Sequence, residues 1–117
     1  MLTVRELTMI YVYSEPVDMR KSINGLSAYI VDEFSHSLQS KDLYVFWNRS
    51  KTHVKILFWD TNGFVIHYKR LERARFKIPR HLSRELVITS DQLNWLLAGL
   101  DFTLMHEFEH VNYSDFY

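Results

Sequence analysis

Two histidines and a glutamate near the carboxyl terminus form the most explicit chemical pattern in the sequence. The segment His106-Glu107-Phe108-Glu109-His110 fits the pattern H-E-x-x-H. On a helix this spacing would place two imidazoles on one face to bind zinc, with Glu107 as the base for a bound water. The surrounding sequence has no long helical pattern, and Asp115 is the only downstream candidate for a third ligand. The sequence therefore predicts a surface cluster with weak, adventitious metal affinity rather than a metal centre.

A magnesium-dependent nuclease or transposase centre would need two or three carboxylates around the ion. The two carboxylates within the basic middle of the chain are Asp60 and Glu72, and Asp18 is a third candidate upstream. Turn formation explains Asp60, and ion pairing with Arg70 or Arg73 explains Glu72. The sequence also has no phosphate-binding glycine loop, no nucleophile elbow and no cysteine. These observations predict a protein that is not an enzyme and uses no cofactor.

The middle of the chain concentrates positive charge and aromatic side chains. Residues 49–84 hold ten lysines and arginines against two carboxylates, a balance of +8, whereas residues 1–48 and 85–117 carry −2 and −6. Cations neutralise phosphates, and exposed aromatic rings stack on unpaired bases. The pattern favours an anionic partner or self-association of tail and middle. A solvated surface of mixed charge remains an alternative. Phe46, Trp47 and Phe58 are expected in the core, which leaves the cations as a surface patch for a nucleic-acid backbone or an acidic protein surface.

The candidate contact residues for DNA or a protein partner fall into two groups. The first group opens the predicted amino-terminal helix and comprises Arg20 and Lys21. The second group runs along the aromatic segment and comprises Arg49, Lys51, Lys55, Lys69, Arg70, Arg73, Arg75, Lys77 and Arg80. The sequence has neither zinc-finger spacing nor a clear helix-turn-helix pattern, so sequence-specific base recognition is not expected.

The elements that must position these residues begin with three strands. Residues 43–47, 54–59 and 64–68 are apolar runs rich in aromatic and β-branched residues, which favour strands. Asn62-Gly63 separates the last two runs and indicates a hairpin, so we predict an antiparallel meander. Alternation places Val54, Ile56 and Phe58 on one face with Val65, His67 and Lys69. Both faces are mainly apolar, so the face left uncovered by helices needs a second layer or a partner.

Further elements flank this meander. Residues 9–13 and 85–88 favour short strands, and Asp18 is a suitable N-cap for a helix that extends to about Phe34. Arg20 and Lys21 then fall in the first turn of this helix, where positive charge opposes the macrodipole. Thr89-Ser90-Asp91-Gln92 has the form of a capping box for a second helix. We predict an α+β fold with a small antiparallel sheet and two main helices packed on one face.

The composition of the 117 residues predicts one domain with a substantial core, since 47% are hydrophobic and 15% aromatic. No segment has the length of a membrane span, and neither a secretory signal pattern nor cysteine is present, so a cytoplasmic protein without a membrane partner is expected. Residues 103–117 form an acidic, aromatic tail that is either frayed or docked on an apolar surface.

Two stretches of the sequence resemble a known family. VKILFWDTNGFVIHYKRLERARF (residues 54–76), preceded by PVDMRK (residues 16–21) and NGL (residues 24–26), is similar to the small TnpB-type accessory proteins of IS66-group insertion sequences. The resemblance covers roughly residues 9–102. Ala74 departs from the pattern, which usually has glycine at this position.

The resemblance implies a non-enzymatic protein that assists transposition and whose partners include the cognate transposase, other element-encoded proteins and element DNA. A protein-interaction adaptor without DNA affinity is the alternative, and a metal-dependent hydrolase at His106–His110 is a third hypothesis. A homo-oligomer is compatible with the sequence.

Overall fold

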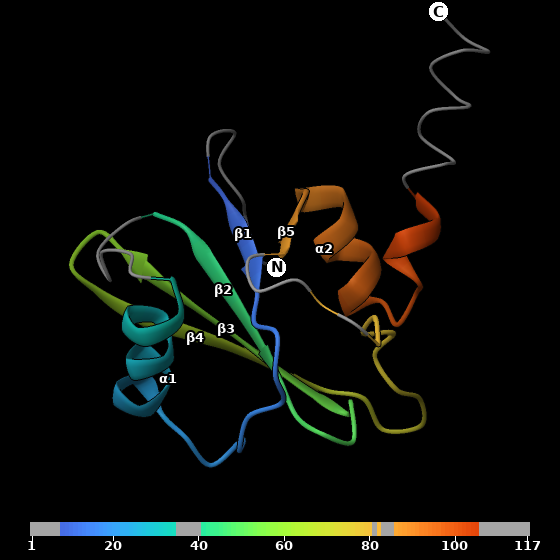
Figure 1. Ribbon diagram of the computed structural model, residues 1–117, viewed down its shortest axis with the longest axis horizontal. Coiled ribbons are helices and arrows are strands. Elements are labelled where there is room, and N and C mark those ends of the chain that lie inside the picture. Colours follow the sequence, from blue (N-terminus) through green and yellow to red (C-terminus); the bar gives the residue numbers. More distant parts are fainter. Residues whose placement is uncertain (1–7, 35–40, 81, 83–85, 106–117) are drawn as a thin grey trace, which may run out of the picture.

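The computed structural model describes residues 8–34, 41–80, 82 and 86–105. These residues form a five-stranded sheet with the strand order β4-β3-β2-β1-β5 (Figure 1). The strands are β1 (Ile10–Val12), β2 (Leu43–Trp47), β3 (His53–Asp60), β4 (Gly63–Arg70) and β5 (Leu86–Ile88). The helices are α1 (Ile23–Tyr29), which continues into a π-helical turn at Ile30–Phe34, α2 (Ser90–Leu97) and a 3-10 turn at Phe102–Leu104.

The structure confirms the meander and the predicted distribution of its side chains. Strands β2, β3 and β4 are antiparallel neighbours, and Ile56 lies opposite His67. The connection from β3 to β4 has two residues, Thr61 and Asn62, because Asp60 pairs with Gly63. The positive φ falls on Thr61, at 51°, so the turn begins one residue before the predicted Asn-Gly pair.

The predicted α+β class is also confirmed, and the sheet is mostly antiparallel. The exception is β1, which pairs in parallel with β2 and antiparallel with β5. The chain passes through α1 between β1 and β2, so β2 can return in the same direction as β1. The edge strands β4 and β5 are separated by three strands.

The two helices pack on opposite faces of the sheet, so the prediction that they share one face was wrong. Leu93 and Leu96 of α2 pack with Val45 and other residues of the same sheet face, whereas Leu26 of α1 packs with Phe46 on the other face. Figure 1 shows α1 near β3 and β4, and α2 near β5. Two apolar sheet faces require two covering layers, and one helix supplies each.

The first helix begins later than predicted. Its N-cap is Ser22, whereas the Asp18 side chain accepts a 2.9 Å hydrogen bond from the Arg20 backbone N–H in the preceding turn. Arg20 and Lys21 therefore precede the helix, and the expected cost of their charge within the first helical turn does not apply.

The second helix begins at the predicted capping box. Thr89 and Gln92 exchange the two hydrogen bonds of a capping box. At the carboxyl end Gly99 has a φ of 82°, and the Leu100 N–H donates to the Trp95 carbonyl, as in a Schellman motif. In the described residues, no helix is sufficiently long and apolar to span a membrane.

Candidate nucleic-acid interface

A buried lysine joins the two stretches that resemble the family. The Lys55 ammonium group donates hydrogen bonds of 2.6 Å to the Met19 carbonyl and 2.9 Å to the Lys21 carbonyl. Its side chain is 8% exposed. Lys55 therefore does not present its charge to a ligand. This finding corrects the prediction that Lys55 contacts a ligand at the surface. It holds residues 19–21 against the β3–β4 hairpin, with their carbonyls directed inward.

This contact brings Arg20 and Lys21 close to the end of the hairpin. Tyr68 of β4 lies opposite Lys55, and Arg70 lies opposite His53 at the next position on the same face. The Lys55 ammonium lies 4.9 Å from the centre of the Tyr68 ring. We call the exposed surface formed by Arg20, Lys21, Tyr68 and Arg70 the hairpin-end surface.

Each arginine of the hairpin-end surface forms an exposed ion pair. Arg20 contacts Asp18 at 2.6 Å, and Arg70 contacts Glu72 at 2.7 Å. Hydrogen bonds from the Arg20 side chain and backbone lower the pKa of Asp18 to about 2. The hydrogen bond to Glu72 raises the pKa of Arg70. Because exposed pairs of this kind contribute little to stability, a phosphate can compete with the carboxylates for either guanidinium group.

Lys21 lies along the first turn of α1. A methyl group on Gly25 would be only 3.1 Å from Lys21 Cβ, so the missing side chain at position 25 gives the lysine room. The Lys21 ammonium lies 5.8 Å from the centre of the Tyr29 ring and remains exposed. Gly25 thus has a packing role beside a predicted contact residue.

The loop between β2 and β3 positions the basic run that follows β4. The Asn48 side chain accepts hydrogen bonds from the backbone N–H groups of Thr52 and His53, at 2.9 and 3.0 Å. The Thr52 and Lys51 carbonyls then accept from the Leu71 and Phe76 N–H groups, at 2.9 and 2.7 Å. These bonds attach residues 71–76 to the end of the sheet.

The remaining predicted cations differ in their availability. Lys69 lies on the opposite sheet face from Arg70, and its ammonium donates to the Leu97 carbonyl at 2.6 Å, where it stabilises the end of α2. Lys51 similarly donates to the Ile78 carbonyl at 3.3 Å. The exposed cations are Arg49, Arg73, Arg75, Lys77 and Arg80, and within the described ranges none of these five forms an ion pair.

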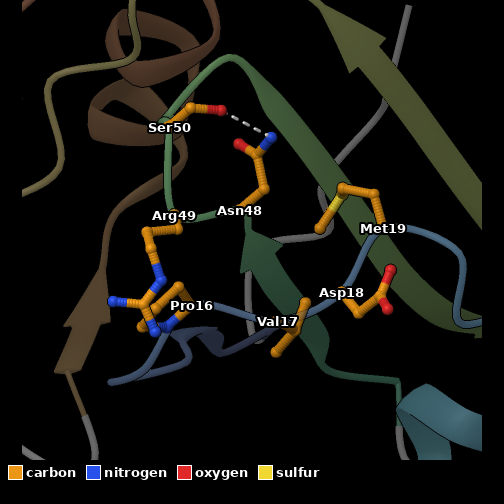
Figure 2. Close-up of a pocket in the computed structure, with 7 residues that line it drawn as sticks. All are labelled: Pro16, Val17, Asp18, Met19, Asn48, Arg49 and Ser50. Atoms are coloured by element: carbon orange, nitrogen blue, oxygen red, sulfur yellow. Dashed lines mark hydrogen bonds between the residues drawn. The ribbon is translucent and has the colours of Figure 1, made fainter.

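A shallow pocket of about 650 Å³ lies beside the hairpin-end surface (Figure 2). Its lining combines the first family-like stretch with the β2–β3 loop, and comprises Pro16, Val17, Asp18, Met19, Asn48, Arg49 and Ser50. Figure 2 shows Arg49 extended toward Pro16, with Asp18 on the other side of Val17. The mixture of apolar atoms and both charge signs suits a protein side chain better than a phosphate.

Sequence reasoning missed two residues of this region. Tyr68 is the one aromatic side chain in the described chain that is strongly exposed, at 52%, and its place opposite Lys55 in the hairpin alternation was the available signal. Asn48, which organises the β2–β3 loop, had no distinguishing pattern.

Ala74, where the family pattern usually has glycine, does not adopt a positive φ, so the backbone tolerates alanine there. The segment His106–His110, predicted to be a surface cluster with weak, adventitious metal affinity, lies outside the described residues.

The geometry is that of a small α+β protein with an exposed cationic surface at one end of its sheet. A family model described as IS66 Orf2 like protein matches residues 8–107, and the chain belongs to this family. Membership implies an accessory role in transposition, and the family is not a known enzyme family.

Two curated relatives come from Sinorhizobium fredii (strain NBRC 101917 / NGR234). Uncharacterized protein y4jC is 30% identical over 94 residues, which cover 80% of each chain. Uncharacterized protein y4hO is 28% identical over 101 residues, which cover 86% of this chain and 88% of the relative. No solved structure matches the chain significantly.

Proposed function

We propose that this protein assists transposition without catalysis, by binding element DNA through its exposed cations and by contacting the transposase. The DNA-contact residues are Arg20, Lys21, Arg70, Arg73, Arg75, Lys77 and Arg80, with Lys69 contributing charge from the opposite face. Lys55 supports the surface from within.

The single observation that carries the proposal is the Lys55 contact with residues 19–21, which joins two cationic segments far apart in the sequence. Clustered cations attract a polyanion more strongly than dispersed ones. Since contacts to phosphates carry no sequence information, the binding should depend weakly on sequence.

The proposal is tested by fluorescence anisotropy with a labelled duplex of the element end and a scrambled duplex of equal length. We expect similar affinities for both, and a steep fall in affinity between 50 and about 200 mM salt, because binding releases counterions from the duplex. Absence of binding at low salt, or an affinity insensitive to salt, would contradict DNA contact.

A protein-interaction adaptor without DNA affinity is the second candidate, and the pocket lined by Pro16, Val17 and Met19 favours it. Co-purification of the cognate transposase with and without DNase separates the two functions. Capture that persists after DNase treatment, combined with no DNA binding in the anisotropy experiment, would favour the adaptor.

A further inference from the structure

Tyr68 presents an aromatic ring within the hairpin-end surface. The ring belongs to β4 and is 52% exposed, whereas tyrosines of the same sheet face such as Tyr13 and Tyr44 are buried. Arg70 follows two positions later on the same face, and a hollow of about 290 Å³ lies between these two side chains and Glu72. An exposed ring beside an arginine combines the two features that recognise an unpaired nucleotide.

The ring is held from beneath rather than from its outer side. Lys55, 8% exposed, places its ammonium 4.9 Å from the ring centre and is itself fixed by the Met19 and Lys21 carbonyls. The His53 ring lies 5.9 Å from the Tyr68 ring, tilted by 36°. These contacts orient the aromatic ring before a ligand arrives, so binding requires less ordering of the side chain.

The charges around the ring match a nucleic-acid backbone. Arg20 and Lys21 lie on the segment that Lys55 holds, and Arg70 lies on the same strand face as Tyr68. All three cations are exposed. Glu72 opposes this charge through its ion pair with Arg70, but the pair is exposed on both sides, at 62% and 70% of the two side chains.

We propose that the hairpin-end surface binds single-stranded DNA, with one unpaired base stacked on the outer face of Tyr68 and the adjoining phosphate bound by Arg70. The inference rests on the proposed DNA contact and specifies the form of DNA. A base within an intact duplex is stacked between its neighbours and cannot lie flat on the tyrosine ring. Glu72 then moderates the affinity, because a phosphate must replace its carboxylate at Arg70.

The test compares a labelled oligothymidylate with a duplex of the same length in the anisotropy experiment, using the full chain. We expect Tyr68→Ala to weaken single-strand binding by about tenfold, because removal of one stacking aromatic side chain lowers the affinity by about this factor. The same substitution should change duplex binding little. The salt dependence should stay unchanged because no charge is removed. Tyr68→Phe should retain most of the affinity, and Glu72→Gln should increase it.

Three further variants serve as controls for the role of the aromatic ring. Tyr68→Leu keeps apolar bulk over Lys55 but removes the aromatic face, so it should lose single-strand affinity with the fold intact by circular dichroism. Val65→Ala, on the opposite face of the same strand, should have no effect. Lys77→Ala should weaken single-strand and duplex binding to a similar degree, as loss of a phosphate contact does.

The outcomes separate the two proposals. Salt-dependent DNA binding that is equal in Tyr68→Leu and the unsubstituted protein would overturn the stacking site and leave the proposed function intact. Absence of salt-dependent binding to either DNA would overturn both. Loss of transposase capture in Tyr68→Leu, with single-strand affinity unchanged, would show that the ring contacts a protein and would also overturn the stacking site.

Discussion

The Lys55 ammonium group lies 2.6 Å from the Met19 carbonyl oxygen, so a lysine in the middle of a strand holds a loop that lies 36 residues earlier in the sequence. Together with the Lys21 carbonyl, this contact accounts for the burial of a charged residue, since buried charges require hydrogen-bonded partners. It also makes the position of Arg20 and Lys21 dependent on the β3–β4 hairpin.

Lys55→Met should destabilise the protein by about 1.5–3 kcal/mol, because the substitution leaves two inward carbonyls without their charged donor. The measurement is urea denaturation followed by tryptophan fluorescence, with hydrogen exchange at residues 19–22. Lys69→Met, which removes a single contact at the half-buried end of α2, is the matched control and should cost less. Equal effects of both substitutions would contradict the special role of Lys55.

Asp18 should titrate with a pKa of about 2, below the ordinary value of 3.8, because Arg20 donates to its carboxylate. A lowered pKa in the folded state means that the ion pair contributes its stability fully above about pH 4 and loses it as the pH falls toward 2. The contribution is small because both groups are exposed. Carbon-detected NMR of the carboxyl group measures the pKa, and Arg20→Gln should return it toward 3.8. A pKa near 3.8 in the unsubstituted protein would refute the pairing in solution.

Gly25→Ala should displace the Lys21 side chain, since the new methyl group would lie 3.1 Å from Lys21 Cβ. Alanine favours a helix by up to about 1 kcal/mol over glycine, so the net change in stability should be small. The DNA affinity should nevertheless fall, because Lys21 is one of the proposed DNA contacts and its side chain would change position. Gly63→Ala, where no atom lies within 4 Å of the added carbon, is the control. A higher DNA affinity in Gly25→Ala would contradict this account.

The sequence predicted those parts of the fold that depend on local patterns. The alternation of Val54, Ile56 and Phe58 with Lys55, Leu57 and Trp59 predicted the two faces of β3. The Thr89–Gln92 capping box predicted the start of α2. Both patterns reflect contacts within a few residues or between adjacent strands, so they can be recognised without knowledge of the tertiary structure.

The errors arose where a residue's actual partner differs from the one that its local pattern indicates. Aspartate is a residue type that favours the N-cap position, so Asp18 was predicted to start the helix. Its carboxylate instead accepts a hydrogen bond from the Arg20 N–H in a turn, and the helix begins at Ile23. Lys55 was assigned to the surface because lysine is rarely buried, and its carbonyl partners lie 34 and 36 residues away. The packing of α1 and α2 on opposite faces could not be predicted. Both sheet faces are apolar, so the residue pattern of the strands does not indicate which face each helix covers.

The most direct test of the central claim is the salt dependence of DNA affinity in the variant Arg20→Ala/Arg70→Ala. If both arginines contact phosphates, the slope of log K against log salt should become shallower by about two, and affinity at low salt should fall. Lys41→Ala removes an exposed cation before β2, at the opposite strand end from the β2–β3 loop, and should leave the slope nearly unchanged. A double variant with the same slope and affinity as the unsubstituted protein would contradict DNA binding at the hairpin-end surface.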